Sequence, residues 1–248
     1  MVGQEGTVRT VVWFSCGSAS AVAARMILKE TPNAFLVYCD TGSEHPDNVR
    51  FRKDVEAWLG VKVWTIRSKK YTDIWDVFKK GRFLNSPAGA LCTVELKKVP
   101  RFRFQSPDDV QVFGYTVGEE ERSKRFKAAN FDVDMRTPLI EQGLTKADCH
   151  AVIREAGIKV PEMYRLGYVN NNCIGCVKGG AGYWNKIRRD FPDVFARMAA
   201  QEREINATVL KDKDGNKLFL DTLKPGVGRY SSEPPVFCGL LCESVVGK

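Results

Sequence analysis

The sequence predicts an α/β fold: a doubly wound, mostly parallel sheet followed by an irregular C-terminal region that carries cysteines. The first 66 residues alternate between apolar, β-branched runs and helical patterns, which implies right-handed crossovers between parallel strands. A chain of 248 residues with 44% hydrophobic residues can bury one large core. We therefore expect one large α/β domain over residues 1–206 and a hairpin with a tail over residues 207–248.

The first five elements follow from their residue types. Apolar, β-branched runs predict strands that are buried on both faces, and stretches with apolar residues on one side of a 3.6-residue period predict helices. On this basis we expect, in order, a strand at Val8–Phe14, a helix at Ser20–Lys29, a strand at Ala34–Cys39, a helix at Asn48–Leu59 and a strand at Val61–Ile66.

The later elements are less regular. Residues 71–79 have a helical pattern, and residues 81–91 contain the Gly, Pro and Ser that are typical of loops. We further expect a strand at Val110–Tyr115, a helix at Thr145–Ala156 capped by Thr145, a largely helical stretch at Gly182–Glu204, a hairpin at Ala207–Leu220 that turns at residues 212–215, and an irregular tail at Lys224–Lys248.

Composition and charge exclude several classes of protein. No segment has the roughly 20 apolar residues that span a bilayer, and the N-terminus lacks the pattern of a secretory signal. Eight cysteines in such a chain indicate a reducing, cytoplasmic setting in which metal or thiol chemistry is favoured over disulfides. With His45 and His150 as the only histidines, a His-rich zinc site or a Ser-His-Asp triad is nearly excluded. The net charge of +8 favours a nucleotide or a nucleic acid as partner.

Two turns follow the first two predicted strands and would lie at the same edge of the sheet. The first contains small residues that let backbone amides approach an anion at a helix N-terminus, and the second contains acids that could accept from a ribose or an adenine. The alternatives are an ordinary capped turn and a solvated Asx turn. The candidate nucleotide-binding residues are Ser15, Gly17, Ser18 and Ser20 in the first turn and Asp40, Thr41, Gly42 and Glu44 in the second.

These two turns resemble those of the PP-loop superfamily of adenine nucleotide α-hydrolase-like proteins, and within it the phosphoadenosine phosphosulfate (PAPS) and adenosine phosphosulfate reductases. The second turn, through Pro46, matches the family pattern Asp-Thr-Gly-x-Glu-x-Pro. In the first turn, Cys16 replaces a Gly, and Ala19 replaces the Asp of the ATP-cleaving members, which the reductases have also lost. The resemblance implies a Rossmann-like PP-loop fold that binds an adenine nucleotide.

The resemblance continues along the chain. Cys92 to Pro100 is similar to the reductase segment Cys-Cys-x-x-Arg-Lys-x-x-Pro, with Thr93 in place of the second Cys and Leu96 in place of the Arg. Residues 114–125 resemble an Arg-bearing loop, and residues 237–240 resemble the tail that carries the nucleophilic Cys. The resemblance implies that Lys97, Arg122 and Arg125 hold phosphate or sulfate and that Cys238 attacks sulfur.

Three cysteines match the positions of a metal site. Reductases with a 4Fe–4S cluster hold it with the Cys pair and a Cys-x-x-Cys, of which Cys92, Cys173 and Cys176 are present here. A cluster with three thiolates leaves one iron open, or free for a ligand from elsewhere. The alternatives are a zinc site completed by Cys238 and Cys242, a redox dithiol of Cys173 and Cys176, or buried cysteines without chemistry, which suits Cys39 and Cys149 best.

The sequence therefore predicts an oxidoreductase that binds PAPS or adenosine phosphosulfate and releases sulfite, with thioredoxin or glutaredoxin as the reductant. The first alternative is an ATP-dependent iron–sulfur sulfurtransferase that modifies nucleic acid. For this alternative, the run Tyr183–Arg189 is the best candidate for nucleic-acid contact, because it combines aromatic and basic residues. The second alternative is a nucleotide-binding module without turnover.

Overall fold

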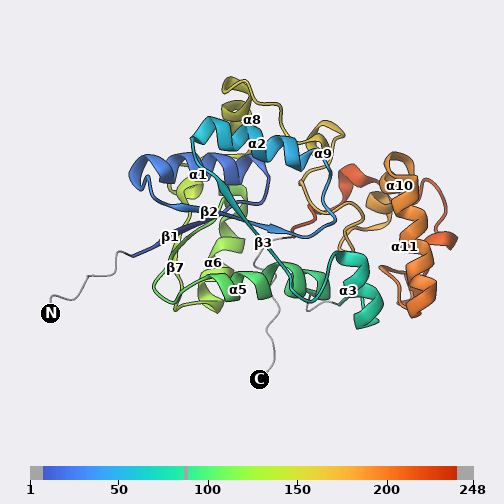
Figure 1. Ribbon diagram of the computed structural model, residues 1–248. Coiled ribbons are helices and arrows are strands. Elements are labelled where there is room, and N and C mark those ends of the chain that lie inside the picture. Colours follow the sequence, from blue (N-terminus) through green and yellow to red (C-terminus); the bar gives the residue numbers. More distant parts are fainter. Residues whose placement is uncertain (1–7, 87–88, 239–248) are drawn as a thin grey trace. The chain divides into compact units, whose positions relative to one another are not determined.

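The structure is a computed structural model that describes residues 8–86 and 89–238 (Figure 1). The predicted tail residues 239–248, including Cys242, lie outside the described residues. Contacts divide the chain into two compact units. Unit 1 comprises the described parts of Met1–Cys39 with Pro46–Ile66 and Phe102–Leu166, and unit 2 comprises Asp40–His45 with the described parts of Arg67–Arg101 and Gly167–Lys248.

A five-stranded sheet in the order β3-β2-β1-β6-β7 forms the framework. The strand β1 (Thr10–Trp13) pairs in parallel with β2 (Phe35–Asp40) and with β6 (Val110–Val112), and β6 pairs in parallel with β7 (Asp134–Arg136). The fifth strand is β3 (Val63–Arg67). Because the chain proceeds outward from β1 to β3 and then returns to β6, the sheet is doubly wound, and the predicted fold class is confirmed.

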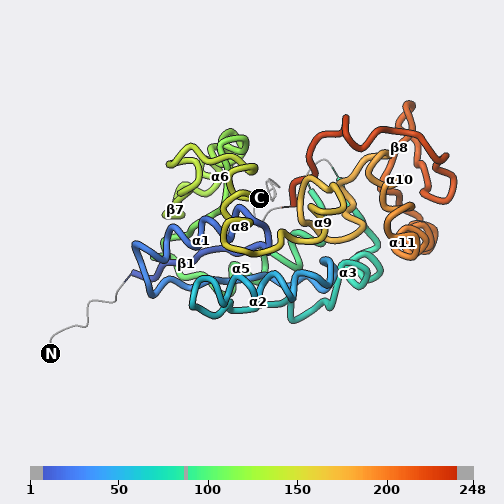
Figure 2. The backbone as a smooth tube through the Cα atoms, turned by 90° about the horizontal axis from the view of Figure 1, so that it is seen from above, coloured from blue at the N-terminus to red at the C-terminus, as the bar shows by residue number. Residues whose placement is uncertain are grey.

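Helices cover one face of this sheet in unit 1. Three of them, α1 (Ser18–Glu30), α2 (Asn48–Leu59) and α8 (Lys146–Glu155), run side by side (Figures 1 and 2). Val12 and Phe14 point into their shared core, as the alternation of a strand requires. Trp13 points to the other face, where Phe104 packs edge-on with ring centroids 6.0 Å apart and Gln111 accepts a hydrogen bond from the indole.

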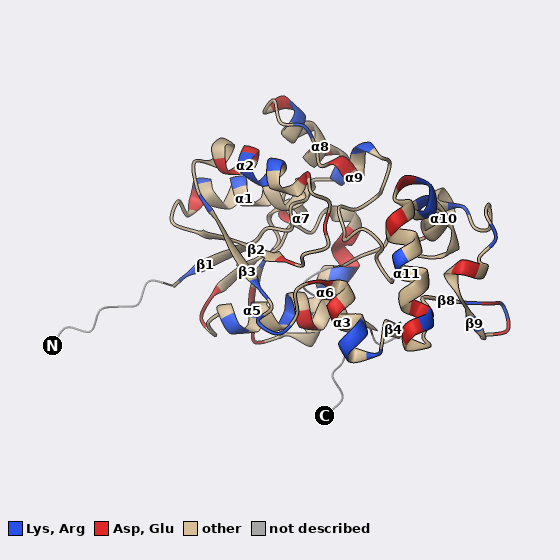
Figure 3. Cartoon of the chain, turned by 45° about the vertical axis from the view of Figure 1, so that its right-hand side comes forward, with Lys and Arg blue, Asp and Glu red and all other residues tan. Residues whose placement is uncertain are grey.

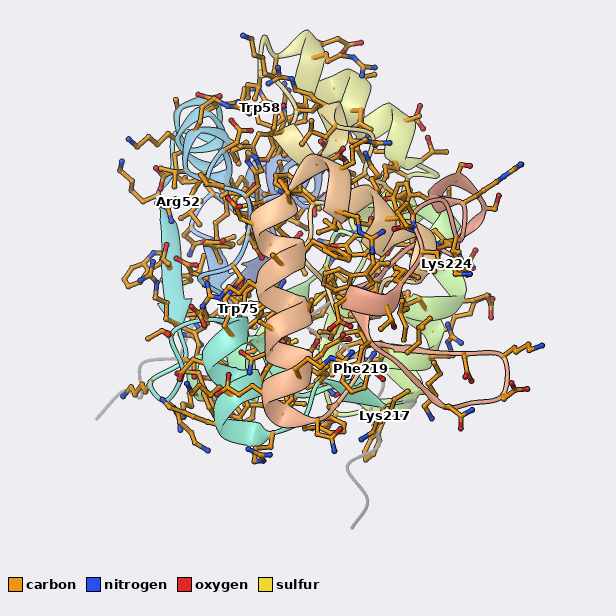
Figure 4. All side chains as sticks on the ribbon, turned by 90° about the vertical axis from the view of Figure 1, so that its right-hand side faces the viewer. Arg52, Trp58, Trp75, Lys217, Phe219 and Lys224 are labelled. Atoms are coloured by element: carbon orange, nitrogen blue, oxygen red, sulfur yellow. The ribbon has the colours of Figure 1, made fainter. Side chains whose placement is uncertain are left out.

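Unit 2 is mainly helical. Two helices, α10 (Ala181–Asp190) and α11 (Pro192–Ile205), pack together, and α11 also contacts α3 (Ile74–Gly81). Trp75 of α3 lies beside α11, with the Arg197 guanidinium 4.5 Å from its ring centroid (Figure 4). The predicted hairpin is present as β8 (Leu210–Lys211) and β9 (Lys217–Leu218), followed by short 3₁₀ turns at Leu220–Thr222 and Tyr230–Ser232.

Several elements differ from the sequence-based expectations. The expected helix Gly182–Glu204 is two helices, because Pro192 begins a new one after Phe191. The expected loop at residues 81–91 contains two short paired strands, β4 (Asn85–Ser86) and β5 (Gly89–Ala90). Elements that were not predicted are α4 (Leu91–Thr93), a π-helix (Val94–Lys98), α5 (Val99–Phe104), a 3₁₀ turn (Val117–Glu119), α6 (Glu120–Ala129), β7, α7 (Pro138–Glu141) and α9 (Glu162–Arg165).

Across the described residues, no helix combines the length and apolar character needed to cross a bilayer.

Candidate functional site

The turn after β1 leads directly into the N-terminus of α1. Gly17 is the N-cap residue, and the first turn of α1 carries no acidic side chain. Ser20 is used within the turn: its hydroxyl accepts from the Ser15 amide at 3.1 Å and donates to the Gly17 carbonyl at 2.9 Å. A helix start of this kind presents backbone N–H groups and a positive dipole end, which favours an anion.

Gly17 and Gly114 lie where other atoms approach the backbone of this turn so closely that a side chain would collide with them. A Cβ atom on Gly17 would lie 3.0 Å from the Tyr164 hydroxyl, and one on Gly114, just after β6, would lie 2.8 Å from the backbone nitrogen of Ser20. The turn therefore lies where β1 and β6 meet, which is the switch point of the doubly wound sheet. Ligands of open α/β sheets bind at such a position.

Ser18 contacts His150, which together with Lys146 forms a basic group that the sequence analysis did not identify. The buried Ser18 hydroxyl is 2.9 Å from His150 Nδ1, and the His150 ring packs against Tyr164 with centroids 4.6 Å apart. Lys146 lies one turn before His150 on α8, with its ammonium 5.8 Å from the Tyr164 ring centroid. The pKa of His150 is lowered by burial and by the positive charges of Lys146 and Arg154, so a bound anion would compensate these charges.

The charge of Lys146 interacts with that of Arg122, one of the two predicted arginines. Burial lowers the pKa of Lys146, Glu119 opposes that shift, and the positive charge of Arg122 adds to it. Arg122 itself forms an ion pair with Glu119 at 2.5 Å and lies over the Tyr115 ring. Of the two predicted arginines, Arg122 is close enough for its charge to act on Lys146. Arg125 is exposed on α6.

The second predicted turn is closed by contacts of Asp40 within the protein. Asp40 accepts from the Gly42 amide at 2.8 Å and forms an ion pair with Arg67, so both of its carboxylate oxygens have partners within the protein. Gly42 has a φ of +64°, and a Cβ atom there would lie 2.3 Å from the Thr72 carbonyl oxygen. The turn is therefore an Asx turn that requires glycine.

Thr41 and Glu44 of this turn contact residues of the cysteine-bearing segments. The Thr41 hydroxyl is 3.1 Å from the Cys173 sulfur, and Glu44 forms a buried ion pair with Lys97 at 3.3 Å. The Ile174 amide donates to the Ser43 carbonyl at 3.0 Å. These side chains, which were predicted to contact a nucleotide, hold the Cys-x-x-Cys segment and the π-helix in place.

Four cysteines from three segments of unit 2 lie together, and we call Cys92, Cys173, Cys176 and Cys238 the cysteine group. The thiols of Cys176 and Cys238 are hydrogen-bonded to each other, and the charge of Cys238 acts on both Cys92 and Cys173. Burial is the main cause that raises the pKa of Cys92, to about 12, while Lys178 and Lys97 oppose it. The hydrogen bond from Cys176 holds the pKa of Cys238 well below its usual range, with Lys97 and Lys178 contributing.

The Cys-x-x-Cys segment is positioned by a buried tyrosine. The Tyr183 hydroxyl accepts from the amides of Gly175 at 3.1 Å and Cys176 at 2.9 Å. Gly175 has a φ of +79°, and a Cβ atom there would lie 2.9 Å from a Val194 methyl group. This arrangement fixes the backbone between the two cysteines.

The described part of the C-terminal tail is irregular, as expected, and is anchored through its backbone carbonyls. The side-chain amides of Asn170 and Asn172 donate to the Val236 carbonyl at 2.9 and 2.6 Å, and Lys178 donates to the Phe237 carbonyl at 3.2 Å. Upstream, Glu233 accepts from the Tyr183 amide at 3.0 Å. These bonds hold the backbone that immediately precedes Cys238.

The cysteine group can be compared with the requirements of two metal centres, a single zinc ion and an iron–sulfur cluster. Among residues 8–86 and 89–238, no three His, Cys, Asp or Glu side chains have a geometry that would hold one metal ion. A single zinc would require its sulfurs about 3.8 Å apart, from Zn–S bonds of about 2.3 Å in a tetrahedron. A cluster of several iron atoms separates its ligands more widely and is held by thiolates alone, and the cysteine group supplies that donor set.

The run Tyr183–Arg189 does not form the nucleic-acid surface that the sequence suggested. Tyr183 and Trp184 are buried and therefore cannot stack on bases. Lys186 and Arg189 both pair with Asp190, at 2.6 and 2.8 Å. Along α11, basic and acidic side chains alternate (Figure 3). The aromatic residues of this run serve the core of unit 2.

Comparison with known proteins identifies the family. Residues 9–179, which are more than half of the chain, match the model of the phosphoadenosine phosphosulfate reductase domain. The chain belongs to this family. As a PAPS reductase domain protein, it is 26% identical over 209 residues to an uncharacterized protein, MJ0066, of Methanocaldococcus jannaschii, a match that covers 78% of this chain and 41% of the relative.

The fold of this PAPS reductase domain protein also resembles a solved structure. The crystal structure of PAPS reductase from Candida auris in a phosphate complex matches 68% of this chain and 82% of that chain, with a TM-score of 0.50 and 16% identity. At this identity the likeness concerns the fold. The family that the sequence predicted is confirmed by the match of residues 9–179 to the family model, while the roles of individual residues stay predictions.

Proposed function

We propose that this protein is a sulfonucleotide reductase-like enzyme, which binds PAPS or adenosine phosphosulfate and releases sulfite. Its membership of the PAPS reductase domain family carries this proposal. The anion would bind at the N-terminus of α1, where the first helical turn carries no acidic side chain and the Ser18 hydroxyl contacts His150. Lys146, one turn before His150 on α8, would add positive charge. Arg122 would add positive charge, and Lys97 would lie at the cysteine group.

Cys238 is the proposed nucleophile. The Cys176 hydrogen bond lowers the pKa of the Cys238 thiol, which favours the thiolate, the reactive form. The thiolate would attack the sulfur of the sulfonucleotide, forming an S–S bond while the S–O bond to the nucleotide phosphate breaks and the nucleotide leaves. A thiol of thioredoxin or glutaredoxin would then attack the Cys238 sulfur. Sulfite would leave with the electron pair of the S–S bond, and the second thiol of the reductant would return Cys238 to its reduced form.

A sulfite assay tests this function. Protein purified without oxygen is incubated with each sulfonucleotide, thioredoxin and its reducing system, and released sulfite is measured. We expect sulfite from the wild-type protein, none from Cys238→Ser, and wild-type amounts from Cys149→Ser, because Cys149 is a buried residue of unit 1 and does not belong to the cysteine group. Wild-type protein that releases no sulfite from either nucleotide would refute the function, and full activity in Cys238→Ser would refute the nucleophile.

The alternative function is an ATP-dependent iron–sulfur sulfurtransferase. The cysteine group favours it, because four thiols can hold a cluster. Ala19 in the first turn of α1 opposes it, because ATP-cleaving relatives have an Asp there. ATP cleavage that depends on a nucleic acid, together with binding that weakens steeply with salt, would favour this alternative over the reductase.

A further inference from the structure

Thr93 and Cys238 are neighbours in the structure although they are 145 positions apart in the sequence. The Thr93 hydroxyl lies 3.7 Å from the Cys238 sulfur, and Thr93 is buried. In the reductase pattern that this segment resembles, the residue after the first cysteine is a second cysteine. The sulfur of Cys238 therefore lies next to the place where a cysteine side chain at position 93 would begin.

Apart from Thr93, the Cys238 sulfur interacts with the other three thiols of the cysteine group. It is hydrogen-bonded to the sulfur of Cys176, and Cys92 and Cys173 are within the range of its charge. The carbonyls of the two preceding residues, Val236 and Phe237, are held by Asn170, Asn172 and Lys178. These hydrogen bonds fix the backbone just before Cys238 and thereby position its sulfur beside the other thiols.

The charges around the cysteine group suit several thiolates in a small volume. The ammonium groups of Lys97 and Lys178 both act on Cys92 and on Cys238. Four thiolates that bind nothing would repel each other strongly in a buried site, whereas metal atoms between them remove that repulsion. Thiolates alone are the donor set that holds an iron–sulfur cluster, and the cysteine group supplies four of them.

We propose that Cys238 is the fourth thiolate ligand of an iron–sulfur cluster whose other ligands are Cys92, Cys173 and Cys176, and that it takes the place of the missing cysteine at position 93. Of the two possibilities for a three-cysteine cluster, an open iron or a ligand from elsewhere, the proposal names the second. The proposal goes beyond the reductase function and does not depend on it. A Cys238 thiolate that binds iron has to leave it before it can attack a sulfonucleotide, so the bound form is a resting state.

An exchange of the ligand position tests this proposal. Wild type, Cys238→Ser, the double variant Thr93→Cys/Cys238→Ser and Cys39→Ser are each purified without oxygen and reconstituted with iron and sulfide. We expect about four irons per chain in wild type and in Cys39→Ser, a buried cysteine of β2 in unit 1. Cys238→Ser should lose iron or change its electron paramagnetic resonance spectrum after reduction. The double variant should regain four irons, because its new sulfur begins beside the old one.

Three results would overturn the ligand role. The first is a Cys238→Ser protein with the iron content and spectrum of wild type, and the second is zinc in place of iron in the wild type. The third uses no variant, and so does not depend on folding: alkylation of the loaded wild-type protein followed by mass spectrometry. Cys238 should be protected together with Cys92, Cys173 and Cys176 and become reactive after chelation, whereas alkylation of Cys238 alone in loaded protein would refute the proposal.

None of these measurements uses a nucleotide. A protein that holds its cluster through Cys238 but releases no sulfite would refute the proposed function and leave the ligand role intact. Sulfite release by wild type, with full iron in Cys238→Ser, would support the function and refute the ligand role.

Discussion

The carboxylate of Glu44 and the ammonium of Lys97 lie 3.3 Å apart with both side chains almost completely buried. This ion pair joins the turn after β2 to the π-helix that follows Cys92. Removing one member leaves the other charge buried without that partner, which costs far more than removing an exposed pair.

We predict that Lys97→Met lowers the free energy of unfolding by about 3 to 5 kcal/mol. The double variant Glu44→Gln/Lys97→Met should recover a large part of this loss, because it removes both charges. Urea denaturation measures both effects. Lys80→Met, which removes a pair with Asp76 on the surface of α3, serves as the control and should cost less than about 1 kcal/mol. Equal costs for Lys97→Met and Lys80→Met would contradict the prediction.

Gly42 and Gly60 offer a matched test of the turn after β2. Both have a positive φ, +64° and +71°, but a Cβ atom would meet the Thr72 carbonyl only at Gly42 and nothing within 4 Å at Gly60. We expect Gly60→Ala to cost about 1 to 2 kcal/mol of unfolding free energy from backbone strain alone. Gly42→Ala should cost about 2 to 5 kcal/mol, because the steric clash is added. Similar melting temperatures for the two variants would show that the turn can shift.

His150 should make anion binding depend on pH. Its pKa is lowered mainly by burial, with Lys146 and Arg154 adding to the shift, and an anion bound beside Ser18 would raise that pKa. Affinity should therefore increase as the pH falls through the interval between the pKa values of the free and bound states. Adenosine phosphosulfate is a suitable probe for calorimetry between about pH 5 and 8, the range in which histidine titrates.

In His150→Gln, we expect the pH dependence to flatten and the affinity at the acidic end to fall about tenfold, the equivalent of one charged hydrogen bond. His45→Gln replaces the other histidine, which packs on Phe191 in unit 2, and should keep the wild-type pH profile. A profile that changes in both variants, or in neither, would contradict the assignment to His150.

Glu202 should make stability depend on pH in the opposite direction to an ordinary carboxylate. Burial raises the pKa of Glu202 to about 7, although its carboxylate accepts from the amides of Leu220 and Val209, each at 2.7 Å. Because the folded state holds this proton and the unfolded state has lost it, stability is highest below the unfolded pKa of 4.5. It is lost as the pH rises towards about 7, by at most about 1.4 kcal/mol per pH unit.

Chemical denaturation of wild type and Glu202→Gln at several pH values isolates this contribution. The difference in unfolding free energy between the two proteins should shrink as the pH increases from 4.5 to about 7. Glu204→Gln, at a half-exposed side chain that pairs with Lys79, should keep the wild-type slope. A constant difference between wild type and Glu202→Gln would mean that Glu202 titrates normally.

The apolar runs predicted the sheet because strands that are buried on both faces consist of apolar residues. Val11 and Val12 are inaccessible to solvent, and the helix Asn48–Leu59 has the predicted bounds because Gly60 ends it in a left-handed conformation. Thr145 caps its helix as expected, accepting from the Asp148 amide. Signals of this kind are local, since each depends on residues a few positions apart.

The site could be predicted only in part, because its decisive contacts are not local. His150 reaches Ser18 across 132 residues, and no motif marks the histidine. The segment Leu91–Phe104 is helical although it contains Pro100, and its middle is a π-helix that no local pattern indicates. The tail is held through backbone carbonyls, which every residue has, so the sequence could not show that Cys238 is anchored.

The spacing of the cysteine group has a consequence for its assembly during synthesis. Cys92 and Cys238 are separated by 146 positions (238 minus 92), so a ribosome that adds about 5 to 20 residues per second needs about 7 to 30 seconds between the two. During that interval Cys92, and later Cys173 and Cys176, are present without their last companion. The group becomes complete only once Cys238 has been made, so whatever all four thiols hold together is acquired after the first three have waited for it.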